Sequence, residues 1–441
     1  MKNIISKIIF YAVAALSLAF CFTACEDEPD RFKLTDGKPV VYYIRPVSAA
    51  SADSLLTSAY MGNSICLVGD NLTSVYKMLF NDQVATLNNS YITDHTLLVD
   101  VPNEIPGEVS NLIYLINKNA DTVKVDFNVL VPGPSISSMK NEYAAIGDAT
   151  VLYGDYFVDD PNVPIQVFVG EKEAKISNFT KGSIEFKIPE GSVENSPLKV
   201  KTIYGEAKSV FNWKDSRGIL FNFDNDPHPT NHGWHAQVIE TDDTAIDGNF
   251  LRLGAPDVTL DADGGWDDGH FSFEYWPGDW DDPKTYADSP RLTDYADFSD
   301  WENMSFKFEM YIPSANPWMS GSMQIICAGV DKITNGGDGV VDIDGVVTAG
   351  ANNTFFHDGP LPRGLYTPWA ATGSFDTADE WITVTLPYAN FIYDEKGGVA
   401  SGSLTVADFT SLTIFVWSGG LKGTDCQPVI KIDNIRAVPN K

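Results

Sequence analysis

The sequence predicts an all-β protein, and three observations support that fold class. Short runs of β-forming residues recur between Gly, Asn, Asp and Pro, as in residues 198–205, which is the pattern of strands joined by turns. Residues 305–312 and 381–387 alternate between apolar and polar side chains, as half-buried strands do. The 35 Gly and 25 Pro in 441 residues fit a folded, turn-rich chain.

The net charge of −30, from 60 acidic and 30 basic side chains, excludes two classes of partner. A strongly acidic protein repels both the phosphates of nucleic acids and anionic lipid headgroups. We therefore expect no nucleic-acid binding and no docking to a membrane through basic residues. The net charge does not exclude neutral partners.

The first residues are typical of a lipoprotein leader. Residues 1–24 form a signal sequence, because Lys2 and Lys7 flank a polar start and the apolar run that follows is too short to span a bilayer. The small residues before Cys25 resemble a bacterial lipobox, which implies that Cys25 is acylated. Residues 25–38 would form a lipidated, acidic tether that resembles the export tag of Bacteroidetes surface lipoproteins. The expected location is the outer membrane, facing the medium.

One internal repeat follows the tether. Gly69-Asp70 matches Gly154-Asp155, and each pair precedes a short strand and then an alternating strand that ends in a hydrophobic residue and Pro. This order of signals resembles IPT/TIG domains, which implies two tandem immunoglobulin-like sandwiches, residues 39–132 and 133–216. Both repeats are poor in Trp and His, so we expect them to act as spacers.

Residues 217–441 differ in composition from the two repeats. Nine of the ten tryptophans lie there, and from Gly218 onward 34 acidic residues stand against 11 basic ones, a net charge of −23 (11 − 34). Residues 412–417 are rich in β-forming side chains and are interpreted as buried on both faces. The expected architecture is a larger, jelly-roll-like β-sandwich.

Large aromatic residues in this domain stand among Gly, Pro and Asp. They are Trp234, Trp266, Tyr275, Trp276 and Trp280, with Trp318 after a Pro further along. Such neighbours predict loops, whereas core tryptophans are expected in alternating strands. A sugar ring stacks its C–H face on an indole, while its hydroxyl groups need carboxylates and amides. The pattern therefore indicates a site for a neutral glycan.

Metal binding and hydrolysis compete for the polar residues of the same domain. Asp224, after the first strand, and Asp433, in the last strand, are candidate calcium ligands, because Ca²⁺ prefers carboxylate oxygens. Weaker metal candidates are His228, His232, His235, Asp338, Asp342 and Asp344. Hydrolysis of a glycan needs two flanking carboxylates, and Glu274 is the best available single residue. We expect no catalytic residue, and no cofactor beyond a structural calcium ion.

The whole arrangement resembles the surface glycan-binding proteins of Bacteroidetes polysaccharide-utilisation systems, in their second, extended form. The C-terminal domain opens with residues 218–224 and closes with residues 431–436. The resemblance implies a non-catalytic lipoprotein whose aromatic platform includes Trp234, Tyr275 and Trp276. Three further rings, Trp280, Trp266 and Trp318, are added because we expect them to be exposed.

The resemblance also implies a ligand and partners. The ligand would be a neutral polysaccharide, a β-glucan such as xyloglucan or mixed-linkage glucan. The partners would be a SusC/SusD-like outer-membrane importer and a surface glycoside hydrolase. Two alternatives remain open from the residues alone: a surface glycoside hydrolase or lyase, and an adhesin that binds a host glycoprotein.

Overall fold

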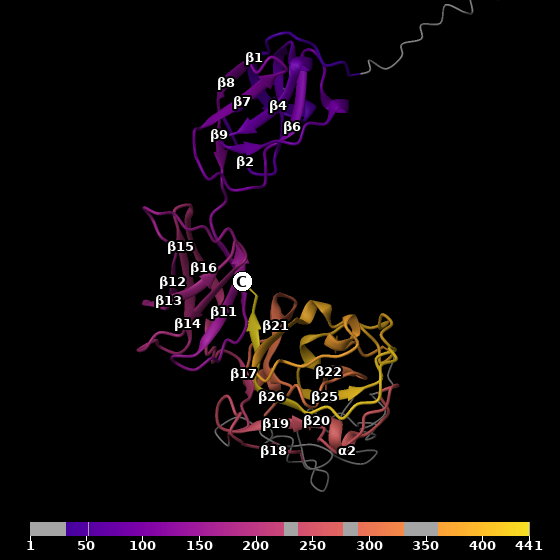
Figure 1. Cartoon of the computed structure of the whole chain (residues 1–441). Coiled ribbons are helices and arrows are strands. Elements are labelled where there is room, and N and C mark those ends of the chain that lie inside the picture. The colour runs from indigo at the N-terminus through magenta and orange to yellow at the C-terminus, as the bar shows by residue number, and fades with distance from the viewer. Residues whose placement is uncertain (1–31, 52, 225–236, 277–289, 330–359, 441) are drawn as a thin grey trace, which may run out of the picture. The chain divides into compact units, whose positions relative to one another are not determined.

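The computed structural model describes residues 32–51, 53–224, 237–276, 290–329 and 360–440. The chain divides into two compact units, residues 1–132 and 133–441, and each is described by itself. Both units are built from β-strands (Figure 1), and the described residues contain a single α-helix, α2 (Asp268–Phe271). The predicted all-β fold class is confirmed. Within the described ranges, no helix is long and apolar enough to span a membrane.

The first unit packs its strands around one hydrophobic core. Its strands are β1 (Val40–Pro46), β2 (Ser58–Tyr60), β3 (Ser64–Asp70), β4 (Val75–Phe80), β5 (Gln83–Val84), β6 (Thr96–Asp100), β7 (Leu112–Asn117), β8 (Thr122–Asp126) and β9 (Asn128–Leu130). They form the sheets β1-β3-β6 and β5-β4-β7-β8 and the pair β2-β9. Along β7 every second residue is buried, because successive side chains of a strand point to opposite faces.

The second unit begins with a seven-stranded sheet. Its strands are β10 (Ser135–Met139), β11 (Ala149–Asp155), β12 (Gln166–Val169), β13 (Lys172–Phe179), β14 (Ser183–Lys187), β15 (Ser196–Thr202) and β16 (Gly205–Trp213). Their order is β10-β11-β14-β13-β12-β15-β16. The start of β13 pairs with β12, whereas its end from Lys175 onward pairs with β14, with a bulge between Ile176 and Asn178. Bulges bend a strand, so β13 lets the sheet fold around its own core.

Close contact between strands explains why the two repeats share a Gly-Asp pair, which ends β3 in the first repeat and β11 in the second. Gly69 lies in β3, which pairs with β1, and Gly154 lies in β11, which pairs with β10. A Cβ at Gly69 would lie 1.8 Å from the carbonyl oxygen of Val40, and one at Gly154 would lie 1.9 Å from that of Ser135. Only glycine permits so close an approach of two backbones. Gly69 and Gly154 therefore have the same role, which is to let two neighbouring strands approach each other closely.

The C-terminal domain consists of two sheets. Its strands are β17 (Ile219–Phe221), β18 (Ile239–Glu240), β19 (Phe250–Leu253), β20 (Ser272–Tyr275), β21 (Met304–Tyr311), β22 (Ser322–Ala328), β23 (Gly364–Tyr366), β24 (Ile382–Pro387), β25 (Ser411–Trp417) and β26 (Ile430–Pro439). The first sheet has the order β18-β19-β26-β21-β24, with β17 also paired to β26. The second sheet has the order β20-β25-β22-β23.

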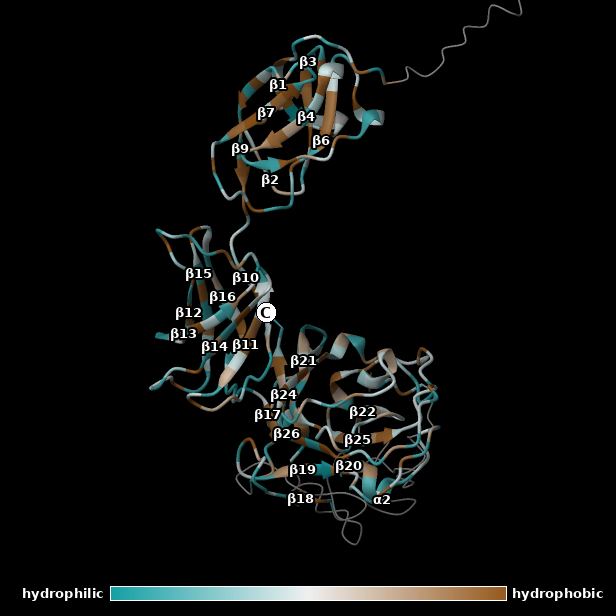
Figure 2. Cartoon of the chain, viewed as in Figure 1, coloured by the Kyte–Doolittle hydropathy of each residue, from teal (hydrophilic) through white to brown (hydrophobic). Residues whose placement is uncertain are grey.

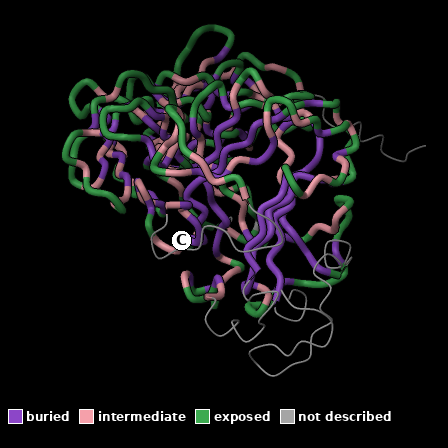
Figure 3. Tube along the Cα trace, turned by 90° about the horizontal axis from the view of Figure 1, so that it is seen from below, coloured by how far each residue is buried: buried purple, intermediate pink, exposed green. Residues whose placement is uncertain are grey.

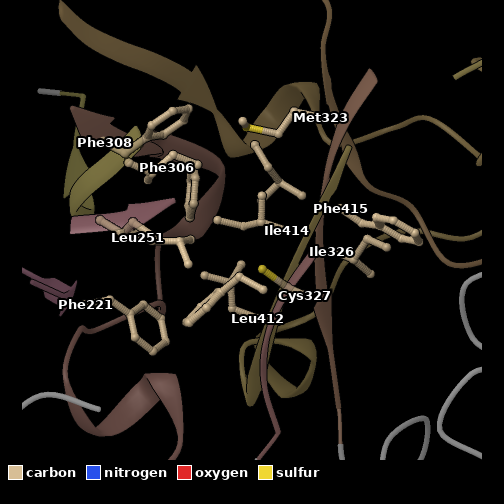
Figure 4. Close-up of a cluster of buried hydrophobic side chains, with 14 of the residues drawn as sticks. Phe221, Leu251, Phe306, Phe308, Met323, Ile326, Cys327, Leu412, Ile414 and Phe415 are labelled. Carbon is tan, nitrogen blue, oxygen red and sulfur yellow. The ribbon is translucent and has the colours of Figure 1, made fainter. Parts of the chain in front are cut away.

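A hydrophobic core lies between the two sheets. Leu412 and Ile414 of the second sheet point toward Phe306 and Phe308 of the first (Figure 4). Phe415, which follows Ile414, lies on the opposite side of its sheet, as the pleat requires. Figure 2 shows hydrophobic residues along the strands, and Figure 3 shows buried residues gathered in them. The second sheet thus has an inner face in the core and a separate outer face.

A buried ion network joins the seven-stranded sheet's domain to the first sheet within the second unit. Arg436 of β26 donates to Glu142, at 2.8 Å, and to Glu309 of β21, at 2.6 Å. Lys307 lies 2.6 Å from the same Glu142. Burial raises the pKa of Glu309, and the charge of Arg436 opposes that shift. Buried charges need partners of this kind because they have left water.

Candidate functional site

The outer face of the second sheet mixes polar and aromatic side chains. In the strand register Glu274 stands opposite Thr413, and Gln324 stands opposite Phe415. Residues directly opposite one another share a face, so the alternation of each strand gives the whole set. We use "outer face" for Ser272, Glu274, Ser322, Gln324, Ile326, Ala328, Leu365, Ser411, Thr413, Phe415 and Trp417. The inner face, by contrast, is apolar because it lies in the hydrophobic core between the two sheets.

An aromatic cluster stands at one end of the outer face. The ring of Trp266 meets Phe415 edge to face, with centroids 4.8 Å apart, and meets Trp417 in the same way at 5.1 Å. Phe415 and Trp417 are nearly parallel, with centroids 5.6 Å apart. Trp266 is 40% exposed, whereas Phe415 is buried and Trp417 is 9% exposed. We call these three residues the Trp266 cluster.

The glycine two residues before Trp266 explains how the cluster is placed. Gly264 has a φ of +64°, and a Cβ there would lie 2.7 Å from the Cα of Gly321 and 2.8 Å from the backbone nitrogen of Ser418. Its carbonyl accepts the N–H of Ser418 at 2.8 Å. Only glycine combines this backbone conformation with such close contact. The loop is therefore pressed against the ends of β22 and β25, and Trp266 follows at the sheet edge.

The polar groups of the outer face bind one another. Glu274 accepts hydrogen bonds from Ser272 and, at 3.0 Å, from Gln237. Gln324 accepts from Arg363 at 2.7 Å and donates to the carbonyl of Trp417 at 2.8 Å. Buried polar groups are stable only with such partners. The carboxylate of Glu274, the amide of Gln324 and the guanidinium of Arg363 are thus buried and fixed, and the indole of Trp266 beside them is exposed.

Tyr275 and Trp276 do not form one platform. Tyr275 points into the core, where its ring centroid lies 5.4 Å from that of Phe221 and its hydroxyl donates to the carbonyl of Pro290 at 2.6 Å. Burial raises the pKa of its hydroxyl. Trp276 points to the outer face, because its indole N–H donates to Thr413 at 2.9 Å, and its ring is fully buried. The prediction that this pair forms an exposed loop platform was wrong, because adjacent strand residues face opposite ways.

Trp318 is also a core residue. Its side chain has no exposed surface, and its indole N–H donates to the carbonyl of Ser320. Its ring centroid lies 6.1 Å from that of Tyr366. The prediction that Trp318 is exposed was wrong, because Trp318 forms an antiparallel bridge with Phe375 and its ring packs into the core. Of the six predicted rings, Trp266 is exposed as predicted, and Trp234 and Trp280 lie outside the described residues.

Sequence reasoning missed four residues that the structure places at this site. They are Gln324, Arg363, Phe415 and Trp417. The signal was the period-two pattern of β22 and β25, in which Ser322 and Gln324, like Ser411 and Thr413, take every second position. Alternating polar residues in a strand indicate a face that is not core.

The predicted calcium residues lie around the middle of β26. Asp433 is 1% exposed, and its Oδ1 accepts the N–H of Asn434 at 2.6 Å. Burial raises its pKa to about 9. Asp224 accepts the N–H of Asn249 at 2.6 Å. Among the residues that the structure describes, no three His, Cys, Asp or Glu side chains are grouped to hold a metal. The other histidine and aspartate candidates, and the lipidation candidate Cys25, lie outside the described ranges.

Comparison with known proteins gives a consistent result. Residues 213–439 match the family described as the surface glycan-binding protein B xyloglucan binding domain. The crystal structure of the surface glycan-binding protein PbSGBP-B from Prevotella bryantii is 46% identical, with a TM-score of 0.79, and the alignment covers 92% of this chain and 100% of that one.

Two further similarities are weaker. The surface glycan-binding protein B from a complex xyloglucan utilization locus in Bacteroides uniformis is 14% identical, with a TM-score of 0.42, over 91% of this chain and 100% of that chain. An IPT/TIG domain-containing protein of Bacteroides ovatus is 29% identical over 159 residues, which are 33% of this chain and 30% of that relative. This chain therefore spans less than a third of the length of that curated relative.

Proposed function

Because the chain belongs to the surface glycan-binding protein B family, we propose that it holds a neutral β-glucan, such as xyloglucan or mixed-linkage glucan, at the cell surface without cleaving it. The observation that carries the proposal is the outer face of the second sheet. There an exposed indole stands beside buried polar groups that are fixed by one another. Glu274 is buried and is held by Ser272 and Gln237, so the polar groups behind the exposed indole have a fixed arrangement.

Trp266 supplies the stacking surface in this proposal. An indole buries up to about 150–250 Å², and at about 25 cal/mol per Å² a partly covered ring contributes on the order of 1–2 kcal/mol. Its edge packing on Phe415 and Trp417 holds the ring before the ligand arrives, so little side-chain entropy is lost on binding. A weak, repeated contact of this kind suits a polymer with many identical units.

Affinity gel electrophoresis tests the proposal. The protein is run through gels that contain xyloglucan, mixed-linkage glucan, laminarin, mannan, starch or a polyuronate. We expect retardation by a neutral β-glucan and not by the polyuronate, because the C-terminal domain is strongly acidic. Trp266→Ala should weaken binding about 5- to 30-fold, which corresponds to the stacking energy above.

The matched control is Tyr153→Ala, which removes an exposed ring of β11 that lies far from the outer face in sequence and in fold. It should bind like the parent protein. Equal binding by folded Trp266→Ala would contradict the platform, and release of reducing sugar from any retarding glycan would contradict a non-catalytic role.

The anchor and the partners complete the proposal. Cys25 carries the lipid, which the lipobox-like Phe22–Cys25 and the acidic residues after it support. The bound glycan passes to a surface glycoside hydrolase and a SusC/SusD-like importer, as the resemblance to surface glycan-binding proteins implies. Metabolic labelling with a palmitate analogue should label the parent protein and Cys21→Ser, but not Cys25→Ser. Label retained in Cys25→Ser would rule out this anchor.

Co-purification of an importer from detergent extracts would support the partner assignment, and its absence after cross-linking would oppose it.

A further inference from the structure

The middle of β26 is the point where both edge neighbours of that strand end. β19 pairs with Ile430 to Ile432 of β26, and β17 pairs with Ile435 and Arg436, so neither strand pairs with Asp433. On the side of β21, the register shifts between Lys307 and Glu309, so that Glu309 stands opposite Asp433. Asn434 takes a φ of +50° at this irregularity. Asp433 therefore sits at a bulge, where the regular ladder is interrupted on several sides.

The carboxylate of Asp433 lacks a partner for one of its oxygens. The residue is 1% exposed, its Oδ1 accepts the N–H of Asn434, and its Oδ2 has no hydrogen-bond partner. The charges that act on it most strongly are carboxylates, those of Glu309, Asp224 and Asp247. A buried carboxylate surrounded by like charges requires a cation or a proton.

The nearby basic side chains are engaged elsewhere. Arg436 pairs with Glu142 and Glu309. Lys214 lies 3.0 Å from Glu194 and 3.8 Å from Asp247. No ion pair is found for Asp433 among the described residues. The cations of the described residues therefore leave the Oδ2 atom of Asp433 uncompensated.

Asp224 lies near the middle of β26, and the surrounding backbone fixes its carboxylate. Its Oδ1 accepts the N–H of Asn249 at 2.6 Å, and the amide of Asn249 donates to the carbonyl of Phe223 at 3.2 Å. A Cβ at Gly248 would lie 2.0 Å from Oδ1 and 2.4 Å from Oδ2 of Asp224. Glycine thus leaves the room that this carboxylate fills. The loop before β19 and the backbone of Phe223 after β17 therefore surround the carboxylate of Asp224.

We propose that Asp433 and Asp224 bind one Ca²⁺ ion, together with backbone oxygens and water. The described residues hold no group of three acidic, His or Cys ligands, so backbone oxygens must complete the shell, as is usual for Ca²⁺. An all-oxygen set excludes the soft-ligand chemistry of zinc. The ion would link the end of β17 to β26, next to Glu309 in the buried ion network. This inference does not depend on which glycan the outer face binds.

Thermal unfolding of the full chain tests the site. With about 2 mM CaCl₂ after treatment with EGTA, we expect the Tm of the second unit to rise by about 3–5 °C, the shift for a site of the affinity typical of extracellular modules. The same concentration of MgCl₂ should give a much smaller shift. Isothermal titration with CaCl₂ should give one site per chain.

Asp433→Asn should abolish the calcium-dependent shift. In EGTA this variant should be at least as stable as the parent, because an amide removes the uncompensated buried charge. A merely structural role of Asp433 would not produce this reversal between the two conditions. Asp224→Asn should also weaken the calcium response, whereas Asp257→Asn, an exposed aspartate of the same domain, should keep all of it.

Three outcomes would overturn the inference. The first is a Tm that CaCl₂ does not change, with no heat of binding. The second is an equal shift with MgCl₂, which would show that the site does not select Ca²⁺. The third is a full calcium response in folded Asp433→Asn. If Asp433→Asn does not fold, the response of Asp224→Asn and the calorimetric stoichiometry of the parent decide the question.

Discussion

Trp417 has little exposed surface, yet it holds the exposed ring beside it. The edge of Trp266 packs on Trp417 at 5.1 Å and on Phe415 at 4.8 Å, so the orientation of the stacking surface depends on two rings that a ligand hardly touches. Residues that support a contact residue in this way are part of a binding site. The contribution of Trp266 to affinity should therefore depend on its neighbours.

This dependence gives a prediction for Trp417→Ala. The variant should lose about 3–5 kcal/mol of stability, as large aromatic truncations do, and it should also lose most of the glycan affinity that Trp266 provides. Trp381→Ala is the matched control, because Trp381 is 8% exposed against 9% for Trp417 but packs with Phe250 and Tyr311 on the first sheet. It should lose stability and keep its affinity. Affinity gels and urea unfolding separate the two effects, and unchanged binding by folded Trp417→Ala would refute the supporting role.

The exposure of single rings could be predicted only in part. Trp266 could be predicted to be exposed because two glycines before it favour a loop at the surface. Tyr275 and Trp318 have equally loop-like neighbours, yet both rings are buried. Their direction depends on the pleat of β20 and on the bridge between Trp318 and Phe375. These are properties of the assembled sheets rather than of the neighbouring residues.

At the scale of elements, local patterns predicted the strands but not their faces. The alternation of β21 and the β-rich run of β25 are readable in the sequence because side chains in a strand repeat every second residue. The prediction that residues 412–417 are buried on both faces is confirmed, because every residue of β25 is buried. A covered binding face and a core face differ in their polar groups, here Thr413 and Ser411, rather than in their burial.

The order of the strands lies beyond local pattern. β26, the last strand, pairs with β17, β19 and β21, which lie far earlier in the chain. Such pairings depend on the packing of the whole domain and leave no short-range signal. For the same reason the bulge at Asp433, the backbone around Asp224 and the contact of Arg436 with Glu142 could not be derived from the sequence.

At the scale of the molecule, the second unit is stabilised across its internal domain junction. Glu142 lies between β10 and β11, and it binds Arg436 at 2.8 Å and Lys307 at 2.6 Å on the first sheet. Its backbone N–H also donates to Thr383 at 2.7 Å. Because these charges are buried, each depends on the others. The two domains of this unit should therefore unfold together rather than independently.

Glu142→Gln tests this coupling because it removes one carboxylate and leaves two buried cations undercompensated. We expect a loss of about 3–5 kcal/mol in the free energy of unfolding, measured by urea denaturation of the full chain with tryptophan fluorescence. Trp213 precedes the junction and the other nine tryptophans follow it, so the two domains contribute to one signal. In the parent, one transition is expected for the second unit, and in Glu142→Gln the transition should move to lower urea and broaden or split.

The matched control is an exposed ion pair across the same junction. Lys140 pairs with Glu380, whose side chain is 58% exposed, and exposed pairs contribute only about 0–1 kcal/mol. Glu380→Gln should therefore leave the unfolding midpoint almost unchanged, although it deletes a carboxylate that bridges the same two domains. If both variants unfold at the parent's midpoint, the buried network does not couple the domains. If both fall equally, the effect comes from net charge at the junction rather than from burial.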